Sequence, residues 1–418
     1  MPRPQVITLG CRLNTFEAEV MREMGSEAGL ESTVIINTCA VTAEAERQAR
    51  QTIRRVAKEN PESKIIVTGC AAQLNPAAYA EMDEVERVLG NEEKLDPARL
   101  TGDGPPVQVA DIMTVKETVP HLISGLEGRT RAFVQIQQGC DHRCTYCIIP
   151  FARGPNRPIA ADAVVAQVRR LVDTGYREVV LTGVDICSYG GEGNGVPDLA
   201  GLVGRVLKEV LDLDRLRLST LDPAAIDEDL VRLFAREDRL MPHMHLSLQA
   251  MDDVVLKRMK RRHLSRDAFD VVDRVRAARP DTVFGADLIA GFPTETGAMF
   301  ENTFSAVADL GLAYLHVFPY SPRPGTPAAR MPQVDPKLRK DRAGRLRMAG
   351  DKGLRRFLKS RTGTTAQVLI ENDGDGECRG LSQHFAPVRI DFQAPVGAIV
   401  DARVTAAGAD YLIASKAA

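Results

Sequence analysis

Three cysteines lie within one short loop, at Cys140, Cys144 and Cys147, directly after a strand-like run at residues 133–138. They are separated by three and then two residues. An iron–sulfur cubane normally takes four cysteine thiolates, so a loop with three would leave one iron open to a ligand from outside the protein. The sequence therefore predicts a loop at the end of a strand that holds a reactive cluster.

A structural zinc site is the competing interpretation, because zinc also binds closely spaced cysteines. Such sites are four-coordinate and closed, so a second cysteine pair or a histidine pair should follow nearby. Cys187 stands alone, and His243 and His245 lie far downstream on a predicted strand, where we expect structural roles. With Tyr146 before its last cysteine, the loop resembles that of the radical S-adenosylmethionine (SAM) superfamily. There it follows the first strand of a partial barrel, and Tyr146 would pack on the SAM adenine or shield the cluster.

Length and composition limit the class of protein. The chain has 418 residues, which favours two or three domains, and a net charge of −2, which argues against a surface wholly covered by nucleic acid. It has no apolar run of about 18 residues, so we expect a soluble, cytoplasmic protein with no membrane partner. In a reducing cytosol, its eight cysteines are expected to be metal ligands or reactive thiols and not disulfides.

The chain divides into three predicted parts, an α/β sheet domain at residues 1–127, a partial barrel at 128–356 and a small all-β barrel at 357–418. In the first, strands alternate with amphipathic helices, as in a parallel sheet. The second repeats strand and helix six times, too few for a complete eightfold barrel. Its strands are expected near residues 133–138, 178–182, 215–219, 243–248, 283–289 and 315–318. The third has short β-rich runs.

A second set of cysteines, Cys11, Cys39 and Cys70, follows the three strands predicted in the first part. The carboxyl ends of parallel strands meet at one edge of a sheet, so loops there can bring three sulfurs around one cluster. A lone free cysteine is more often a small buried apolar residue. Three cysteines at equivalent positions favour a shared site, which would again lack a fourth cysteine ligand. Cys187 and Cys378 fit neither set.

Four segments, residues 8–14, 36–42, 68–73 and 138–150, together resemble the methylthiotransferase family over essentially the whole chain. Members have an N-terminal cluster domain, a radical SAM domain and a C-terminal TRAM domain that binds RNA. Residues 148–154 resemble the branch that acts on threonylcarbamoyladenosine beside the tRNA anticodon; sister branches act on isopentenyl-adenosine or on a ribosomal-protein aspartate. A structural iron–sulfur or zinc protein that binds RNA is the non-enzymatic alternative. Residues 250–253 depart from the small turn that the family usually has there.

The resemblance implies two [4Fe-4S] clusters and SAM as cofactors. SAM would bind the open iron held by Cys140, Cys144 and Cys147, and its reductive cleavage would remove a hydrogen from carbon 2 of the adenosine. The cluster at Cys11, Cys39 and Cys70 would present a methylated sulfur for transfer to that carbon. An external electron donor and a sulfur source are then required as partners, besides tRNA.

Further SAM contacts are expected at the ends of the barrel strands. The resemblance places Gly183 and Asp185 at the amino acid part of SAM, and Asp287, Gly291 and Phe318 at its adenosine. Ser219 and Gln249 are polar residues at strand ends that can face SAM or substrate. An ordinary role in a turn at the end of a strand is the alternative for each of them.

A strongly basic segment precedes the predicted C-terminal barrel. Residues 339–361 contain ten basic and two acidic residues, a net charge of +8. A helix of this charge can neutralise several phosphates, although a solvated helical face is the more common explanation of such a run. Because small β-barrels can bind nucleic acid, we expect Arg355, Arg356 and Arg361 to contact tRNA.

Overall fold

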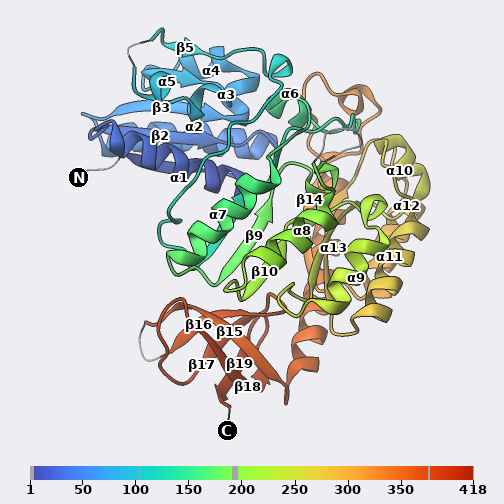
Figure 1. Cartoon of the computed structure of the whole chain (residues 1–418). Helices are drawn as coiled ribbons and strands as arrows, with labels where there is room; N and C mark the ends of the chain where they lie inside the picture. Colours follow the sequence, from blue (N-terminus) through green and yellow to red (C-terminus); the bar gives the residue numbers. More distant parts are fainter. Residues whose placement is uncertain (1–3, 103, 191–195, 375–376, 418) are drawn as a thin grey trace.

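The N-terminal part is a five-stranded parallel sheet with helices on its faces, as expected (Figure 1). The computed structural model describes residues 4–102, 104–190, 196–374 and 377–417. The strands, in both chain and spatial order, are β1 (Gln5–Thr8), β2 (Thr33–Thr38), β3 (Lys64–Gly69), β4 (Arg87–Leu89) and β5 (Val107–Gln108). The helices are α1 (Arg12–Glu27), α2 (Ala43–Glu59), α3 (Cys70–Leu74), α4 (Pro76–Ala80) and α5 (Pro97–Thr101). All six residues of β2 are buried, since it has neighbours on both sides and helices over its faces.

The central part is an open barrel of parallel strands, and all six expected strands are present. They are β6 (Arg131–Gln135), β9 (Glu178–Thr182), β10 (Arg215–Leu218), β12 (His243–Gln249), β13 (Val283–Ala290) and β14 (Tyr314–Pro319). The short strand β11 (Thr220–Leu221) begins the second of two sheets, ordered β10-β9-β6 and β11-β12-β13-β14. Strands β6 and β14 are therefore the two edges, and the barrel is open between them.

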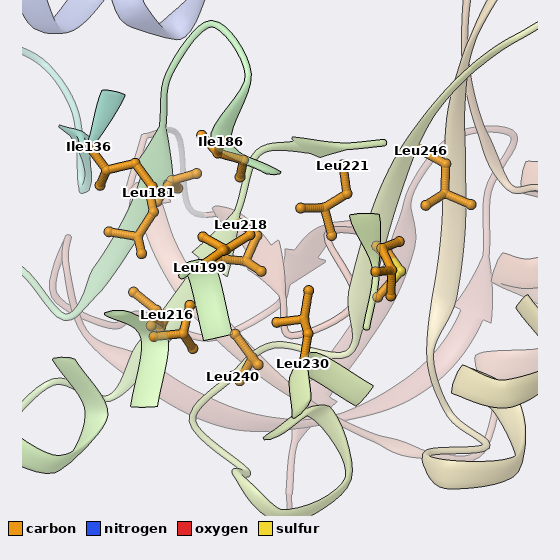
Figure 2. Packing of buried hydrophobic residues seen from close by; sticks show 14 of the residues in the cluster. Ile136, Leu181, Ile186, Leu199, Leu216, Leu218, Leu221, Leu230, Leu240 and Leu246 are labelled. Carbon is orange, nitrogen blue, oxygen red and sulfur yellow. The ribbon is translucent and has the colours of Figure 1, made fainter. Parts of the chain in front are cut away.

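Helices cover the outside of this barrel (Figure 1). They are α7 (Ala161–Asp173), α8 (Leu199–Glu209), α9 (Glu228–Arg236), α11 (Ser265–Ala278), α12 (Gly297–Asp309) and α13 (Pro336–Arg361). Buried leucines on the strands, including Leu181, Leu216 and Leu246, pack with Leu199 and Leu230 of the helices in one continuous core (Figure 2). The helix α1 of the N-terminal part packs against β6, so it lies at the open side of the barrel.

The C-terminal part is a closed five-stranded β-barrel, as expected. Its strands are β15 (Thr365–Asn372), β16 (Cys378–Ser382), β17 (Pro387–Ile390), β18 (Ile399–Ala407) and β19 (Leu412–Lys416), in the spatial order β15-β16-β17-β19-β18. Helix α13 leads into it and places the fully buried Leu358 in its core. The predicted boundary at residue 357 therefore falls within a continuous helix, and the domain limits stay a prediction.

The C-terminal barrel contacts the ends at which the strands of the central barrel begin. Arg215 of β10 donates to the carbonyl of Gln367 at 2.7 Å, and Arg217 donates to that of Ser382 at 2.9 Å. The buried carboxylate of Glu178 accepts from Arg217 at 2.7 Å. These contacts leave the opposite, carboxyl ends of the strands for the cysteine loop. Among the residues described, no helix combines the length and apolar character needed to cross a bilayer.

Candidate active site

The cysteine loop, residues 140–147, follows the short strand β7 (Gln137–Gln138) and is held by backbone hydrogen bonds. The N–H of Cys140 donates to the carbonyl of Gly154 at 3.0 Å, and that of Thr145 donates to the carbonyl of Met259 at 3.0 Å. Gly139 has a φ of +69°, and a Cβ there would overlap the carbonyl of Pro155. Only glycine suits this turn, because the backbone is left-handed and closely packed.

The three thiols of the loop are half-buried, unbridged and close enough to affect one another. Burial is the main cause that raises the pKa of Cys140 to about 12, and the negative charge of Asp185 is the second. Burial likewise raises the pKa of Cys147 to about 12, and Cys144 contributes to both shifts. Two thiols that resist ionisation, with a third beside them, fit a site where bound iron stabilises the thiolates.

Asp185 and Gly183, at the end of β9, lie beside this loop. The carboxylate of Asp185 is 3.0 Å from Nε2 of His142, accepts from Ser188 at 2.7 Å and lies 3.9 Å from Sγ of Cys140. Burial alone would raise the pKa of Asp185, but the hydrogen bonds from His142 and Ser188 lower it overall. A Cβ at Gly183 would lie 2.9 Å from the carbonyl oxygen of Gln137, so this position requires close backbone approach.

Asp287 faces two histidines on the neighbouring strands. Its Oδ1 atom lies 3.0 Å from Nε2 of His245 and 3.0 Å from Nδ1 of His316. Gly291, at the end of β13, has a φ of +71° and lies against the side chain of Arg339 in α13. Phe318 is 39% exposed on the edge strand β14. Phe318 is thus accessible and Asp287 only partly so, with 20% of its side chain exposed, whereas Gly291 is covered by α13.

Three other predicted residues differ in their surroundings. The backbone N–H of Ser219 donates to the carbonyl of Leu181, and its side chain is buried. Gln249 has a φ of +66° at an irregularity in the pairing of β12 with β13. Tyr146 packs edge-on against Phe292 with ring centroids 6.5 Å apart, and its burial raises its pKa well above the usual value. Packing of this kind suits the shielding role for Tyr146.

The auxiliary trio, Cys11, Cys39 and Cys70, comes together at the carboxyl edge of β1, β2 and β3. A Cβ at Gly10 would lie 2.8 Å from Cβ of Cys39, so the turn before Cys11 directly contacts the loop after β2. Burial is the main cause that raises the pKa of Cys39 to about 11, and the nearby thiols of Cys70 and Cys11 add to this shift. Cys70 and Cys39 are buried, while Cys11 is accessible to solvent. As in the loop, clustered thiols, with a raised pKa at Cys39, fit an iron–sulfur site.

Arg153, which was not predicted as a site residue, links the two sets of cysteines. It ends α6 (Ile149–Arg153), the helix that follows the cysteine loop, and its Nε donates to Sγ of Cys70 at 3.1 Å. Its Nη2 donates to Asn14 at 2.5 Å and to Glu17 at 3.0 Å. The only available signal was its position within residues 148–154, which indicate the family branch. The loop and the auxiliary trio are therefore joined by a short helix and one buried guanidinium.

The basic helix α13 uses part of its charge within the protein. Arg339 donates to the carbonyl of Tyr320 at 2.7 Å, and Arg342 pairs with Glu295 at 2.7 Å. Arg355 and Arg356 are exposed, whereas Arg361 is half-buried with its guanidinium 5.6 Å from the ring centroid of Phe357. The surface charge is accordingly smaller than the +8 of residues 339–361 indicates.

The partial barrel and its cysteine loop define the class of protein, a radical SAM enzyme. The Radical SAM superfamily model matches residues 134–307, and the model of the uncharacterized protein family UPF0004 matches residues 3–90. The fold is also found in a radical SAM methyltransferase, TsrM from Kitasatospora setae, with a TM-score of 0.57, 15% identity, and coverage of 79% of this chain and 77% of that one. This class uses SAM and a [4Fe-4S] cluster.

Curated relatives cover almost the whole chain. The threonylcarbamoyladenosine tRNA methylthiotransferase MtaB of Rickettsia prowazekii is 49% identical over 410 residues, which are 98% of this chain and 96% of that protein. The protein of the same name from Bacillus subtilis is 33% identical, covering 87% of this chain and 84% of its own length. A tRNA-2-methylthio-N(6)-dimethylallyladenosine synthase of Bartonella bacilliformis is 32% identical, covering 98% and 95%. The chain belongs to the tRNA methylthiotransferase family.

Proposed function

We propose that this enzyme methylthiolates carbon 2 of threonylcarbamoyladenosine next to the anticodon of tRNA. The observation that carries the proposal is the pair of three-cysteine sites joined through Arg153. The relative from Rickettsia prowazekii, at 49% identity, supports this substrate over its alternatives. Relatives named for dimethylallyladenosine are less similar, at 32% and 33% identity, and a ribosomal-protein aspartate is the remaining alternative in the family.

Cys140, Cys144 and Cys147 would hold the cluster that binds SAM, and the auxiliary trio would hold a second [4Fe-4S] cluster. When bound, these groups supply the radical that removes the inert hydrogen and the sulfur that replaces it. The protein's own part is to position them: Arg153 donates to Cys70, and the loop packs against Met259 and Ala328 through the backbone of Thr145. Tyr146 excludes water from the side of the loop that faces Phe292.

Asp185 and Gly183 are the best supported of the SAM contacts, since both lie beside the cysteine loop. Phe318 is exposed on the edge strand of the barrel and Asp287 is partly exposed, and substrate or the adenosine of SAM would bind near them. Ser219, Gln249 and Gly291 complete the proposed set at the strand ends. Gly291 would act indirectly, through Arg339, because α13 covers it.

The tRNA would contact the C-terminal barrel and the end of α13, with Arg355 and Arg356 exposed to its phosphates and Arg361 nearer to Phe357. An unpaired anticodon-loop adenosine can be turned out toward the barrel at modest cost. The proposal further requires an electron donor and a source of sulfur for the second cluster.

Nucleoside mass spectrometry tests the substrate. The reconstituted enzyme is incubated with SAM, a reductant and tRNAs carrying either threonylcarbamoyladenosine or isopentenyl-adenosine. We expect the 2-methylthio form of the first nucleoside alone. Product from the isopentenyl tRNA alone would overturn the substrate assignment, and SAM cleavage without methylthiolation of either tRNA would overturn the proposed reaction.

Iron analysis tests the second cluster. Two cubanes predict about eight irons and eight sulfides per chain, and substitution of the auxiliary trio by alanine should leave about four of each. Cys187→Ser is the matched control: its sulfur accepts from the N–H of Asp222 at 3.2 Å, and a hydroxyl can accept the same bond. An unchanged iron content in the triple variant would contradict a cluster at this site.

A further inference from the structure

Arg12 is a cation with no direct ion-pair partner among the described residues, and it lies between the auxiliary trio and the C-terminal barrel. It is the first residue of α1, directly after Cys11, and its guanidinium lies 5.9 Å from the ring centroid of Phe385 in the C-terminal barrel. Among the residues described, no side chain or carbonyl forms a hydrogen bond or ion pair with it. A half-buried guanidinium offers several donors in a planar fork, and a carboxylate satisfies them well.

Two further guanidiniums lie at the same ring, and both already have partners. Those of Arg131 and Arg217 are 5.3 Å and 5.4 Å from the Phe385 centroid. Arg131 pairs with Glu371 at 2.9 Å, and Arg217 pairs with Glu178 at 2.7 Å. Each of these cations therefore has a direct acidic partner, although Arg217 shares Glu178 with Arg215. Arg12 has no such partner among the described residues and can pair with an anion from outside.

The charges of Glu178 and Asp287 favour the cation at Arg12, but neither carboxylate forms an ion pair with it, and Asp287 has other partners. Its Oδ1 is already shared by His245 and His316 at 3.0 Å each. The ligand atoms of these three residues lie within 4.8 Å of one another, as in a metal site. The nearby positive charge of Arg12 disfavours a metal cation there, so the group is better suited to fixing the orientation of the two histidines.

We propose that Arg12 binds the carboxylate on the N6 substituent of the substrate adenosine. This inference rests on the proposed function, because the threonyl part of threonylcarbamoyladenosine ends in a free carboxylate, whereas an isopentenyl group carries no charge. Arg12 adjoins Cys11 of the auxiliary trio and extends toward the inner face of the barrel at Asp287 and Phe385. It can therefore hold the substituent while carbon 2 stays near the sulfur site. Arg12 would act as a residue that determines substrate specificity.

The test uses two anticodon stem-loop RNAs, one with threonylcarbamoyladenosine and one with its carboxyl methyl ester. Both are given to reconstituted holoenzyme of the wild type, Arg12→Gln, Arg12→Lys and Arg205→Gln, an exposed control on α8 that pairs with Glu209 at 2.6 Å. We expect wild type to favour the acid by about tenfold to a hundredfold in kcat/KM, the range of one charge-assisted contact. Arg12→Gln should lose this preference mainly through KM, Arg12→Lys should keep part of it, and Arg205→Gln should keep all of it.

Equal loss for acid and ester in Arg12→Gln, or an unchanged preference, would overturn the role of Arg12. Fluorescence anisotropy compares the binding of the acid and ester RNAs without turnover. The iron content of each variant shows whether both clusters remain. If Arg12→Gln fails to hold its clusters, the comparison of wild type with Arg12→Lys takes its place. A wild type that does not prefer the acid over the ester would overturn the inference. A wild type that methylthiolates neither RNA would instead refute the proposed function.

Discussion

Glu17 is a fully buried carboxylate between two buried cations. It pairs with Lys94 at 2.6 Å, and Arg153 donates to it at 3.0 Å, while Arg153 also contacts Cys70. Burial alone would raise its pKa, but Arg153 and Lys94 outweigh that effect and lower the pKa of Glu17 to about 2. The charge balance behind the auxiliary trio therefore depends on one residue of α1.

Glu17→Gln should destabilise the cluster-free protein by about 3 kcal/mol at neutral pH, because two buried cations would lose their shared anion. The pKa of Glu17 is lower in the folded state, so its stabilisation is present above the ordinary glutamate pKa. It is lost as the pH falls from about 4.5 toward about 2. Urea unfolding across this range should show the dependence in wild type and lack that component in the variant.

The control for this prediction is Glu44→Gln, since Glu44 pairs with Arg47 on the exposed face of α2. Its unfolding should stay close to that of wild type, because an exposed ion pair contributes little to stability. An equally small effect of Glu17→Gln would mean that the carboxylate is not required to balance Arg153 and Lys94.

At the scale of single residues, the sequence indicated both groups of cysteines but not the residues that support them. Both cysteine sets could be predicted because each cysteine follows a strand or lies in one compact motif. Glu17, Lys94 and Arg153 could not, since charged residues are usually exposed and nothing local indicates that three of them share one buried network. Arg12 was not predicted as a site residue either, because the residues around it come from all three parts of the chain.

At the scale of elements, the turn that precedes the cysteine loop depends on one glycine. Gly139 combines a φ of +69° with close contact to Pro155, so that any side chain would displace the loop. The strands around it were predictable from their apolar runs. Strands β4 and β5 were not, because they contain only three and two residues. The parallel pairing of β19 with β17 across the closed barrel was not predictable either.

Gly139→Ala should shift Cys140 and abolish binding of the cluster in the loop. We expect iron content to fall by about half and SAM cleavage to be lost, while the circular dichroism of the folded protein is kept. The matched control is Gly297→Ala at the start of α12, where a Cβ would meet no atom within 4 Å. Normal iron content and SAM cleavage in Gly139→Ala would show that the turn tolerates a side chain.

At the scale of the whole molecule, α13 joins the barrel that does the chemistry to the barrel proposed to bind RNA. The pattern of expected strands and helices predicted both barrels, but not how they meet. The junction is formed by Arg215 and Arg217 with carbonyl oxygens about 150 residues further along the chain, which leave no pattern in the sequence. The basic charge of α13 was likewise overestimated, because Arg339 and Arg342 are bound to the central barrel.

Replacing Arg355, Arg356 and Arg361 by glutamine should weaken tRNA binding and reduce the slope of log affinity against log salt. A decrease of about two units is expected, about one for each exposed arginine and little for the half-buried Arg361. Binding titrations at several salt concentrations measure this slope. Arg232→Gln, an exposed residue of α9, is the control, and iron content should be unchanged in both. Identical slopes for wild type and the triple variant would exclude α13 from the RNA interface.

The two cysteine sites are proposed to perform separate steps on one substrate, and a single product analysis tests this directly. The alanine variant of Cys11, Cys39 and Cys70 is incubated with SAM, reductant and tRNA carrying threonylcarbamoyladenosine, and both nucleoside products are quantified by mass spectrometry. We predict 5′-deoxyadenosine from SAM, because Cys140, Cys144 and Cys147 remain, but no 2-methylthio nucleoside. Formation of the methylthio nucleoside by this variant at the wild-type rate would contradict the account.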